Sequence, residues 1–278
     1  MPKVINDSHQ SFIIMHALLR QFVILTLSTM IACPSLHAAQ RHIDAKPRVT
    51  ILVDDSYPPY SYVSNGYLYG IYVEQVKLAA RQLSDHYQIT LEAIPWKRGV
   101  AAMESGDAFA LMPPYIHKDK RPYIWPYSVS LGEEAVVAFC NEGITLQNIL
   151  RRKPSSRPIN IGINAGFLIL DDELASARER GLIKIWENKD TRSNIRKLAK
   201  NRLDCYLNDR LSTVMGIESL QSELQTLDIS EFKEDRVVLT RTAHIGYTKE
   251  NGDKFPYKLD FIEKMNKALQ TVQQKNTR

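Results

Sequence analysis

Short apolar runs alternate with amphipathic stretches along most of the chain. Three runs in the first half predict strands, at residues 49–53, 89–94 and 108–112. Between them, apolar positions at helical spacing predict one helix over residues 71–84 and a second over 98–105, which Gly106 closes. The order strand, helix, strand, helix, strand favours a parallel sheet covered by helices.

The same pattern begins again in the second half of the chain. Strands are predicted at residues 134–140, 159–163, 183–187 and 203–207, and helices at 169–180, 192–200 and 210–220. Two late strands, 237–240 and 244–248, precede a helix over residues 257–273. We therefore expect two similar α/β units in tandem, with the last elements able to return to the first unit.

The first 39 residues differ in character from everything that follows. Residues 22–32 form an apolar run that follows Arg20 and precedes the small residues Ala38 and Ala39, which is the layout of a secretory signal peptide. The run is shorter than the about 20 residues that a membrane span needs, so a retained anchor is the second choice. We expect cleavage near Ala38 or Ala39 and export to the periplasm.

Cysteine usage fits such an exported protein. Cys33 lies inside the predicted signal peptide, which leaves Cys140 and Cys205 in the mature chain. An even number of cysteines is compatible with one disulfide in an oxidising compartment, and two buried free thiols are an equal alternative. Lipid attachment at Cys33 and translation from Met15 also stay open.

Composition narrows the class of protein without naming a ligand. The 278 residues are 44% hydrophobic and 24% charged, which is globular composition and long enough for two lobes with separate cores. The formal net charge is +5, but acidic and basic residues are interleaved and form no long basic run. The chain is therefore expected to have a mildly basic surface and no nucleic-acid partner.

Several short motifs stand in one order and spacing. They are residues 54–62 (DDSYPPYSY), 65–74 (NGYLYGIYVE), 95–98 (PWKR), 103–107 (MESGD), 120–121 (KR), 126–128 (PYS), 162–166 (GINAG) and 203–209 (LDCYLND). Through them, the chain from about residue 49 to residue 273 resembles the type II periplasmic solute-binding proteins of the polar amino-acid kind, bacterial extracellular solute-binding protein family 3.

The resemblance implies an α/β, two-lobed periplasmic-binding-protein-like type II fold. Each lobe would hold a central sheet flanked by helices, with two crossover strands as the hinge. Lobe 1 would comprise residues 48–138 plus 238–278, and lobe 2 residues 139–237. The family implies a monomer that holds a small-molecule ligand in the cleft and serves an inner-membrane ABC permease or a sensor.

The resemblance also implies roles for individual residues. Arg121 takes the place of the arginine that grips the ligand's α-carboxylate, and its planar fork suits a carboxylate. Asp209 takes the place that receives the α-ammonium, so that only the closed form satisfies both ends of a zwitterion. Asp54, Tyr57 and Trp96 match positions that line the side-chain pocket. The alternatives are an exposed surface arginine at 121 and a helix N-cap at 209.

Four further residues complete the predicted ligand-binding set: Asn164, Gly166, Phe167 and Tyr115. Two of them mark departures from the family pattern. The segment before Arg121 is Pro113-Pro114-Tyr115-Ile116, where the family usually has glycine and a hydroxyl residue, and proline offers no backbone N–H. Phe167 replaces the threonine expected after Gly166. These differences argue against an ordinary α-amino acid as ligand and leave the expected fold unchanged.

Three classes of function follow from these observations. A binding protein without chemistry of its own leads, because the chain lacks Gly-x-Ser-x-Gly, His-Glu-x-x-His, Cys-x-x-Cys and a glycine-rich phosphate loop. We therefore predict no catalytic residue, no metal and no cofactor. An enzyme on the same fold is the alternative, as is an envelope interaction protein that has lost its ligand. His117 lies near the expected cleft, but a lone histidine is more often structural.

Overall fold

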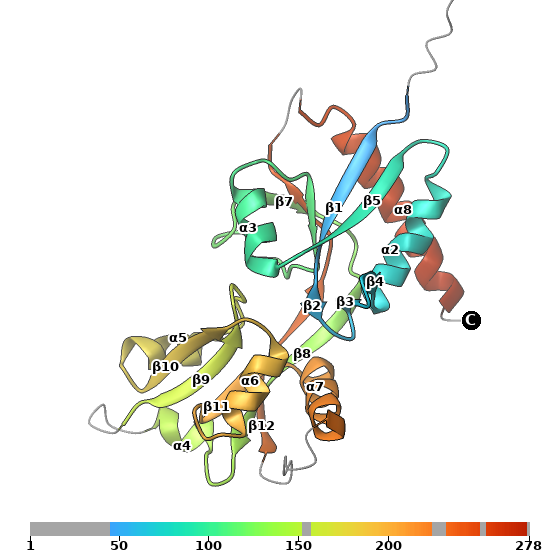
Figure 1. The fold of residues 1–278 in the computed structure, drawn as a ribbon. Helices are drawn as coiled ribbons and strands as arrows, with labels where there is room; N and C mark the ends of the chain where they lie inside the picture. Colours follow the sequence, from blue (N-terminus) through green and yellow to red (C-terminus); the bar gives the residue numbers. More distant parts are fainter. Residues whose placement is uncertain (1–44, 152–156, 224–231, 251–253, 277–278) are drawn as a thin grey trace, which may run out of the picture. The chain divides into compact units, whose positions relative to one another are not determined.

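The computed structural model describes residues 45–151, 157–223, 232–250 and 254–276 (Figure 1). The predicted signal peptide, residues 1–39, lies outside them. Every helix and strand named below belongs to the unit of residues 46–278. Two five-stranded sheets and one three-stranded sheet make up its β-structure. The larger sheets, each with its flanking helices, are called the first and second lobes.

The first lobe is built on the sheet order β5-β1-β6-β13-β7. Its strands are β1 (Arg48–Asp54), β5 (Gln88–Ile94), β6 (Ala110–Met112), β7 (Ile124–Tyr127) and β13 (Gly246–Thr248), and its helices are α2 (Ile71–Gln82), α3 (Trp96–Glu104) and α8 (Lys258–Asn276). α3 covers one face, and α2 with α8 covers the other (Figure 1). Alternate residues of β1 therefore enter two cores: Ile51 packs with the α2 side, and Leu52 packs with Trp96 and Met103 of α3.

The second lobe is built on the sheet order β10-β9-β11-β8-β12. Its strands are β8 (Gly132–Asn141), β9 (Ile159–Asn164), β10 (Ile183–Asn188), β11 (Cys205–Asp209) and β12 (Phe232–Ala243), and its helices are α4 (Leu146–Leu150), α5 (Asp172–Glu179), α6 (Thr191–Leu198) and α7 (Arg210–Glu223). A disulfide joins Cys140 to Cys205. Because these two residues are paired in the β8–β11 register, the bond connects neighbouring strands of one sheet.

Both large sheets are mixed, whereas the pattern of elements predicted parallel ones. The strand–helix–strand repeats do give parallel pairs, β1 with β5 and β6 in one lobe and β9 with β10 and β11 in the other. β13 runs antiparallel to β6 and β7, and β8 runs antiparallel to β11 and β12. The antiparallel strands belong to the part of the chain that passes between the lobes, where no crossover helix forces a parallel direction.

Two long strands carry the chain between the lobes. β8 and β12 pair from Gly132 with Ala243 to Asn141 with Phe232, and β12 leads directly into β13 of the first sheet. The predicted lobe boundaries, at residues 138/139 and 237/238, fall inside these strands. The predicted strand, 237–240, covers only part of β12. Two register shifts interrupt the alternation of apolar and polar positions along β12, so the sequence pattern did not reveal its full length.

A small sheet absent from the sequence prediction follows β1. It consists of β2 (Ser56–Tyr57), β3 (Ser61–Ser64) and β4 (Tyr67–Tyr69). Gly70 then begins α2 with a φ of 133°, and a Cβ on it would lie 2.1 Å from the Tyr60 carbonyl oxygen. Only glycine allows so close an approach, which presses Tyr60 against the start of α2. The Tyr60 and Tyr72 rings stack there with centroids 4.7 Å apart.

One helix boundary differs from the prediction in a way that matters for the site. The periodicity predicted a helix over residues 169–180, but α5 begins at Asp172, because Asp171 caps it by accepting a hydrogen bond from the Leu174 backbone N–H. Ile169 and Leu170 are therefore loop residues, although their spacing matches the helix. Among the described residues, none of the helices combines the length and apolar character of a membrane span.

Candidate functional site

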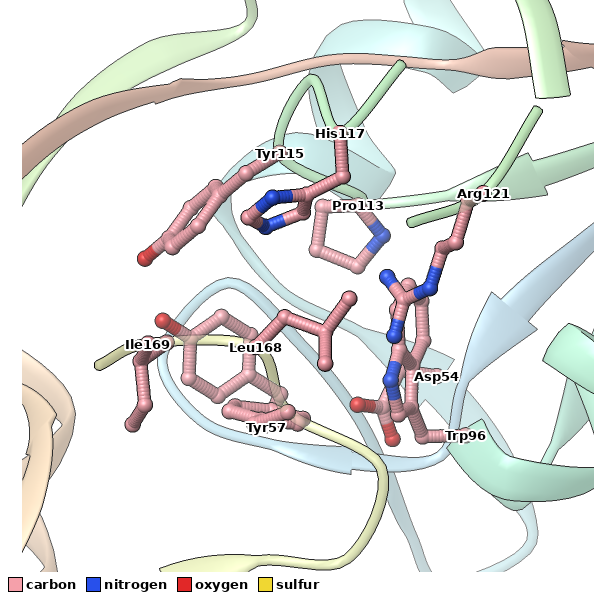
Figure 2. A pocket seen from close by; sticks show the side chains of 10 residues that line it. Asp54, Tyr57, Trp96, Pro113, Tyr115, His117, Arg121, Leu168 and Ile169 are labelled. Atoms are coloured by element: carbon pink, nitrogen blue, oxygen red, sulfur yellow. The ribbon is translucent and has the colours of Figure 1, made fainter. Parts of the chain in front are cut away.

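A small cavity lies where loops of the two lobes meet (Figure 2). The first lobe lines it with Asp54, Tyr57, Trp96, Pro113, Tyr115, His117 and Arg121, and the second with Phe167, Leu168 and Ile169. Figure 2 shows Leu168 lying among the residues of the first lobe. The cavity measures about 20 Å³, which is space for about one water molecule. An amino-acid-sized ligand does not fit while the second-lobe residues hold this position.

Arg121 is the cationic group of this cavity. It lies between β6 and β7 and is only 4% exposed, so the surface-residue alternative is wrong. One guanidinium nitrogen, Nη2, donates to the Gly166 carbonyl oxygen at 2.6 Å. The guanidinium also lies 5.3 Å from the centre of the Trp96 ring, within the range of a cation–π contact. A buried guanidinium with donors beside a cavity suits recognition of a carboxylate.

Asp54 is the acidic group on the same wall. It is the last residue of β1, is 3% exposed, and accepts a hydrogen bond from the Ser56 backbone N–H at 3.0 Å. It forms no ion pair with any residue in the described part of the chain. Burial raises the pKa of its carboxyl group to about 7. The Asp54 carboxyl can therefore change charge near neutral pH when a cationic group enters the cavity.

Aromatic side chains form the remaining walls. Tyr57 and Trp96 each meet the Phe167 ring edge to face, with centroids 5.4 and 5.9 Å away. His117 lies beside Arg121, and burial together with that positive charge lowers its pKa to about 4. The imidazole is therefore neutral at physiological pH. The sequence interpretation had favoured a structural role for His117, and the structure places it in the cavity wall.

Glu134 is a buried carboxyl group that sequence reasoning had not assigned to the site. It lies on β8, is 1% exposed, and accepts hydrogen bonds from three tyrosine hydroxyls, those of Tyr57, Tyr72 and Tyr115. Burial raises its pKa to about 7 despite these donors. Two of the three tyrosines line the cavity, so Glu134 ties the cavity wall to a strand that runs between the lobes. Its only sequence signal is an acid beside an apolar run.

Asp209 does not line the small cavity. It ends β11 and caps α7, with Oδ1 accepting from the Ser212 backbone N–H and from the Tyr60 hydroxyl, both at 2.9 Å. The predicted N-cap role is therefore confirmed. Burial raises the pKa of the carboxyl group. The nearest link to the cavity is the Tyr60 ring, which lies 5.2 Å from the ring of Tyr57.

The second-lobe residues predicted for the site fall into two groups. Gly166 has a φ of 80°, which favours glycine, and its carbonyl oxygen accepts from both Arg121 and Trp96 Nε1, the latter at 3.3 Å. Asn164 is 3% exposed, and its Oδ1 accepts from the Tyr206 hydroxyl and from Asn194 Nδ2. The Asn164 side chain is thus engaged inside the second lobe, while Gly166 faces the first.

Two larger hollows adjoin the small cavity. One, of about 400 Å³, is lined by Asp54, Asp55, Ser56, Pro95, Trp96, Lys97, Arg98, Ala101, Asn164, Ala165, Phe167 and Lys189. The other, of about 590 Å³, lies over the second lobe and has Ile163, Leu170 and Ile185 among its apolar lining. Phe167 lines all three hollows. Volumes of 300 to 1,000 Å³ are typical of small-molecule sites. Among the described residues, no acidic, histidine and cysteine side chains group into a metal site.

Comparison with known proteins agrees with this architecture. The family model of bacterial extracellular solute-binding proteins, family 3, matches residues 49–278. No match was found among curated protein sequences. Solved structures match over most of their length and at low sequence identity.

Three of these structures describe the range of similar proteins. A histidine kinase sensor domain with similarity to periplasmic binding proteins has a TM-score of 0.66 at 13% identity, over 84% of this chain and 93% of that chain. An ancestral arginine-binding protein bound to arginine has 0.63 at 16%, over 84% and 95%. The substrate-binding protein of an amino acid ABC transporter has 0.59 at 12%, over 82% and 94%. This likeness establishes the type II periplasmic-binding-protein fold, and with the family match it shows that the chain belongs to the bacterial extracellular solute-binding proteins, family 3.

Proposed function

We propose that the chain is a periplasmic binding protein that captures a small amino-acid-like solute between its two lobes. It has no chemistry of its own and works as a monomer. It delivers the solute to an inner-membrane ABC permease or reports it to a sensor. The observation that carries the proposal is the buried Arg121 guanidinium, which lines a cavity together with Asp54 and an aromatic wall.

The proposal assigns one role to each group. Arg121 binds the carboxylate of the solute, and Asp209 binds its ammonium group from the other lobe. Asp54, Tyr57, Trp96 and Tyr115 contact the side chain, and Asn164, Gly166 and Phe167 shape the second-lobe wall. Because Arg121 and Asp209 belong to different lobes, binding both ends of one solute couples recognition to closure of residues 139–237 against the remainder.

The comparisons support the class of solute without naming it. One similar structure binds arginine and another belongs to an amino acid transporter, as their descriptions state. A buried acid and a buried guanidinium on one wall suit a solute that carries both charges. The aromatic rings add a flat surface on which a guanidinium, a ring or an apolar group can stack.

Thermal-shift screening of the purified mature protein tests the proposal. The panel contains basic, neutral and aromatic amino acids, short peptides, polyamines and organic acids, because any compound that binds only the folded state raises the melting temperature. We expect a hit among compounds with a carboxylate. Consumption of the hit compound would show an enzyme, and no hit across the panel would favour a protein that has lost its ligand.

Calorimetric titration of the hit then tests the assigned anchor. Arg121→Ala is expected to weaken binding by about 100-fold or more, because it leaves the solute's carboxylate desolvated and unpaired. Arg121→Lys should recover only part of the affinity, since an ammonium group cannot present two parallel donors. Arg81→Ala, at an exposed position on α2, is the matched control and should bind as the wild type does. Equal binding by Arg121→Ala would remove Arg121 from the site.

A further inference from the structure

The segment from Gly166 to Ile169 connects β9 to α5 and lies against the first lobe. Phe167, Leu168 and Ile169 line the 20 Å³ cavity. The same three residues also line the 590 Å³ hollow. The segment therefore borders both a small space and a large one, and its movement out of the small space would enlarge the room beside Arg121.

The contacts of this segment match those expected from a solute. The Gly166 carbonyl oxygen takes a guanidinium donor of Arg121 at 2.6 Å, where a carboxylate oxygen of the solute would bind. The Phe167 ring meets both Tyr57 and Trp96 edge to face, where the solute's side chain would lie. Together the two residues present an acceptor oxygen and a flat ring to the first lobe.

Asp209, the other residue predicted to bind a charged end of the solute, also has a hydrogen-bond partner from across the cleft. Asp209 of the second lobe accepts a hydrogen bond from the hydroxyl of Tyr60, which belongs to the segment after β1, at 2.9 Å. Each charged group assigned to the solute is thus satisfied by a neutral group from the opposite side of the cleft. Arg121 and Asp209 thus each have a hydrogen-bond partner across the cleft, and for Asp209 this partner adds to the Ser212 backbone N–H.

Beside Arg121, the solute and the segment compete for the same space. The 20 Å³ that remain beside Arg121 hold about one water molecule. A carboxylate bound to Arg121 needs the place of the Gly166 oxygen, and a side chain bound between Tyr57 and Trp96 needs the place of the Phe167 ring. The 590 Å³ hollow, which Phe167 also lines, offers room into which the ring can turn.

We propose that Gly166–Ile169 is an internal occupant of the cleft, and that Phe167 determines which solutes bind by competing with them for the site. The proposal rests on the cleft assigned under the proposed function and adds the class of solute. The Gly166 oxygen and the Phe167 ring take the places of a carboxylate and a flat group. The solute that displaces them therefore joins a carboxylate to a flat group, such as an aryl ring or a guanidinium. A solute with only a small aliphatic side chain cannot displace the ring.

Chemical rescue with aryl carboxylates tests this competition without knowledge of the natural solute. Phe167→Ala removes the ring, and phenylacetate then supplies both a ring and a carboxylate. By calorimetric titration we expect phenylacetate to bind Phe167→Ala at least about tenfold more tightly than it binds the wild type. Cyclohexylacetate, whose puckered ring is thicker than a flat aromatic ring, should gain less affinity. Toluene, which lacks the carboxylate, should gain the least affinity.

Two variants make the result specific to the cleft. Adding Arg121→Ala to Phe167→Ala should abolish the gain, because the carboxylate then has no anchor. Phe255→Ala is the matched control: Phe255 is also partly buried, but it packs on Phe109 in the core of the first lobe. It should show no gain. Equal affinity of phenylacetate for wild type, Phe167→Ala and Phe255→Ala would overturn the proposal.

A second measurement keeps the test decisive if phenylacetate binds too weakly to titrate. The chain has three tryptophans, and Trp125 and Trp186 are exposed, so Trp125→Phe with Trp186→Phe leaves Trp96 as the single reporter. Acrylamide should quench Trp96 weakly in this background and at least about twice as strongly after Phe167→Ala. Unchanged quenching would overturn the proposal.

The two proposals fail separately in these experiments. If no amino-acid-like solute is found but phenylacetate binding and Trp96 quenching both depend on Phe167, the internal occupant stands and the transport function falls. If a solute binds with the same affinity to wild type and Phe167→Ala, the cleft functions and the internal occupant is refuted.

Discussion

The two lobes contribute different chemistry to the cleft. The first lobe presents buried side chains that carry charge or aromatic rings, chiefly Arg121, Asp54 and Trp96. The second lobe presents a backbone carbonyl oxygen, at Gly166, and apolar side chains. Its polar residues at the ends of strands, Asn164 and Asp209, are engaged in its own network and helix cap.

The difference teaches that similar topology does not give two equivalent half-sites. In both lobes the carboxyl ends of parallel strands point toward the cleft, which is where α/β sheets place ligand-binding groups. In the second lobe, Asp209 at the end of β11 and Asp190 just after β10 also cap the N-termini of α7 and α6, whose first N–H groups need acceptors. The charged and aromatic groups of the small cavity therefore come mainly from the first lobe, and apolar side chains of the second lobe close it.

Among the tests of this difference between the lobes, the largest expected change in affinity comes from asking whether the second lobe adds a charge of its own. Asp209→Asn keeps a good helix cap and an oxygen for the Tyr60 hydroxyl, but it removes the negative charge. We expect an α-amino acid ligand to bind about 30-fold more weakly, since its ammonium group loses a buried partner. Titration with the same ligand lacking its amino group is the control and should show no change. Loss of affinity for both ligands would mean that the variant disturbs the cleft as a whole.

The next effect, on stability and not on affinity, is expected where polar groups of the two lobes meet at Glu134. Its pKa is about 7 when folded and 4.5 as the ordinary value, so the folded state binds more protons between these pH values. The stabilisation from this group is complete below pH 4.5 and is lost as the pH rises to about 7. Its size is on the order of 3 kcal/mol.

Denaturant unfolding at about pH 5 and about pH 8 measures this dependence. Glu134→Gln does not titrate and can still accept from the tyrosine hydroxyls, so the fall in the free energy of unfolding with pH should be shallower than in the wild type. Asp54→Asn tests the other carboxyl group whose pKa burial raises to about 7. This variant should also make the free energy of unfolding fall less steeply with pH. A slope unaffected by Glu134→Gln would show that this carboxyl is ionised throughout.

The smallest effect concerns the ion pair that joins the lobes at the surface. Lys97 of α3 lies 2.9 Å from Glu187 of β10, and the two side chains are 69% and 44% exposed. Solvent and salt weaken such a pair. Lys97→Ala should change ligand affinity less than about threefold, and less still at high salt. Lys233→Ala, which breaks a pair with Glu142 within the second lobe, is the matched control. A loss of tenfold would make this pair part of the closing mechanism.

Much of the fold could be predicted from local pattern. β1, α2, β5 and α8 lie within a few residues of their predicted positions, because each has one buried face and a clear period. β7 and the small sheet β2–β4 were not predicted, since these strands are short, β7 contains Pro126, and Pro58-Pro59 and Asn65-Gly66 separate the strands of the small sheet. α5 was predicted too long because Ile169 and Leu170 match its period by chance and bury their side chains elsewhere.

The candidate site was likewise predicted only in part from the sequence. Residue type and order pointed to Arg121, Asp54, Tyr57, Trp96, Tyr115 and Phe167, and all six line one cavity. Glu134, Leu168 and Ile169 were missed, because an acid beside an apolar run and two apolar loop residues have no local signal of a site. Their part follows from neighbours far away in sequence, such as Tyr57 for Glu134.

By itself, the sequence determined the order of the longer strands and helices, the resemblance to the family, and an arginine and two acids at the positions that the family uses for its ligand. Those properties depend on residue type and spacing along a short stretch. The tertiary structure alone decided that Gly166 satisfies Arg121 across 45 residues and that Tyr60 satisfies Asp209 across 149. The physical reason is that a buried polar group takes whichever partner the folded chain brings within reach, and only the complete path of the chain sets that distance.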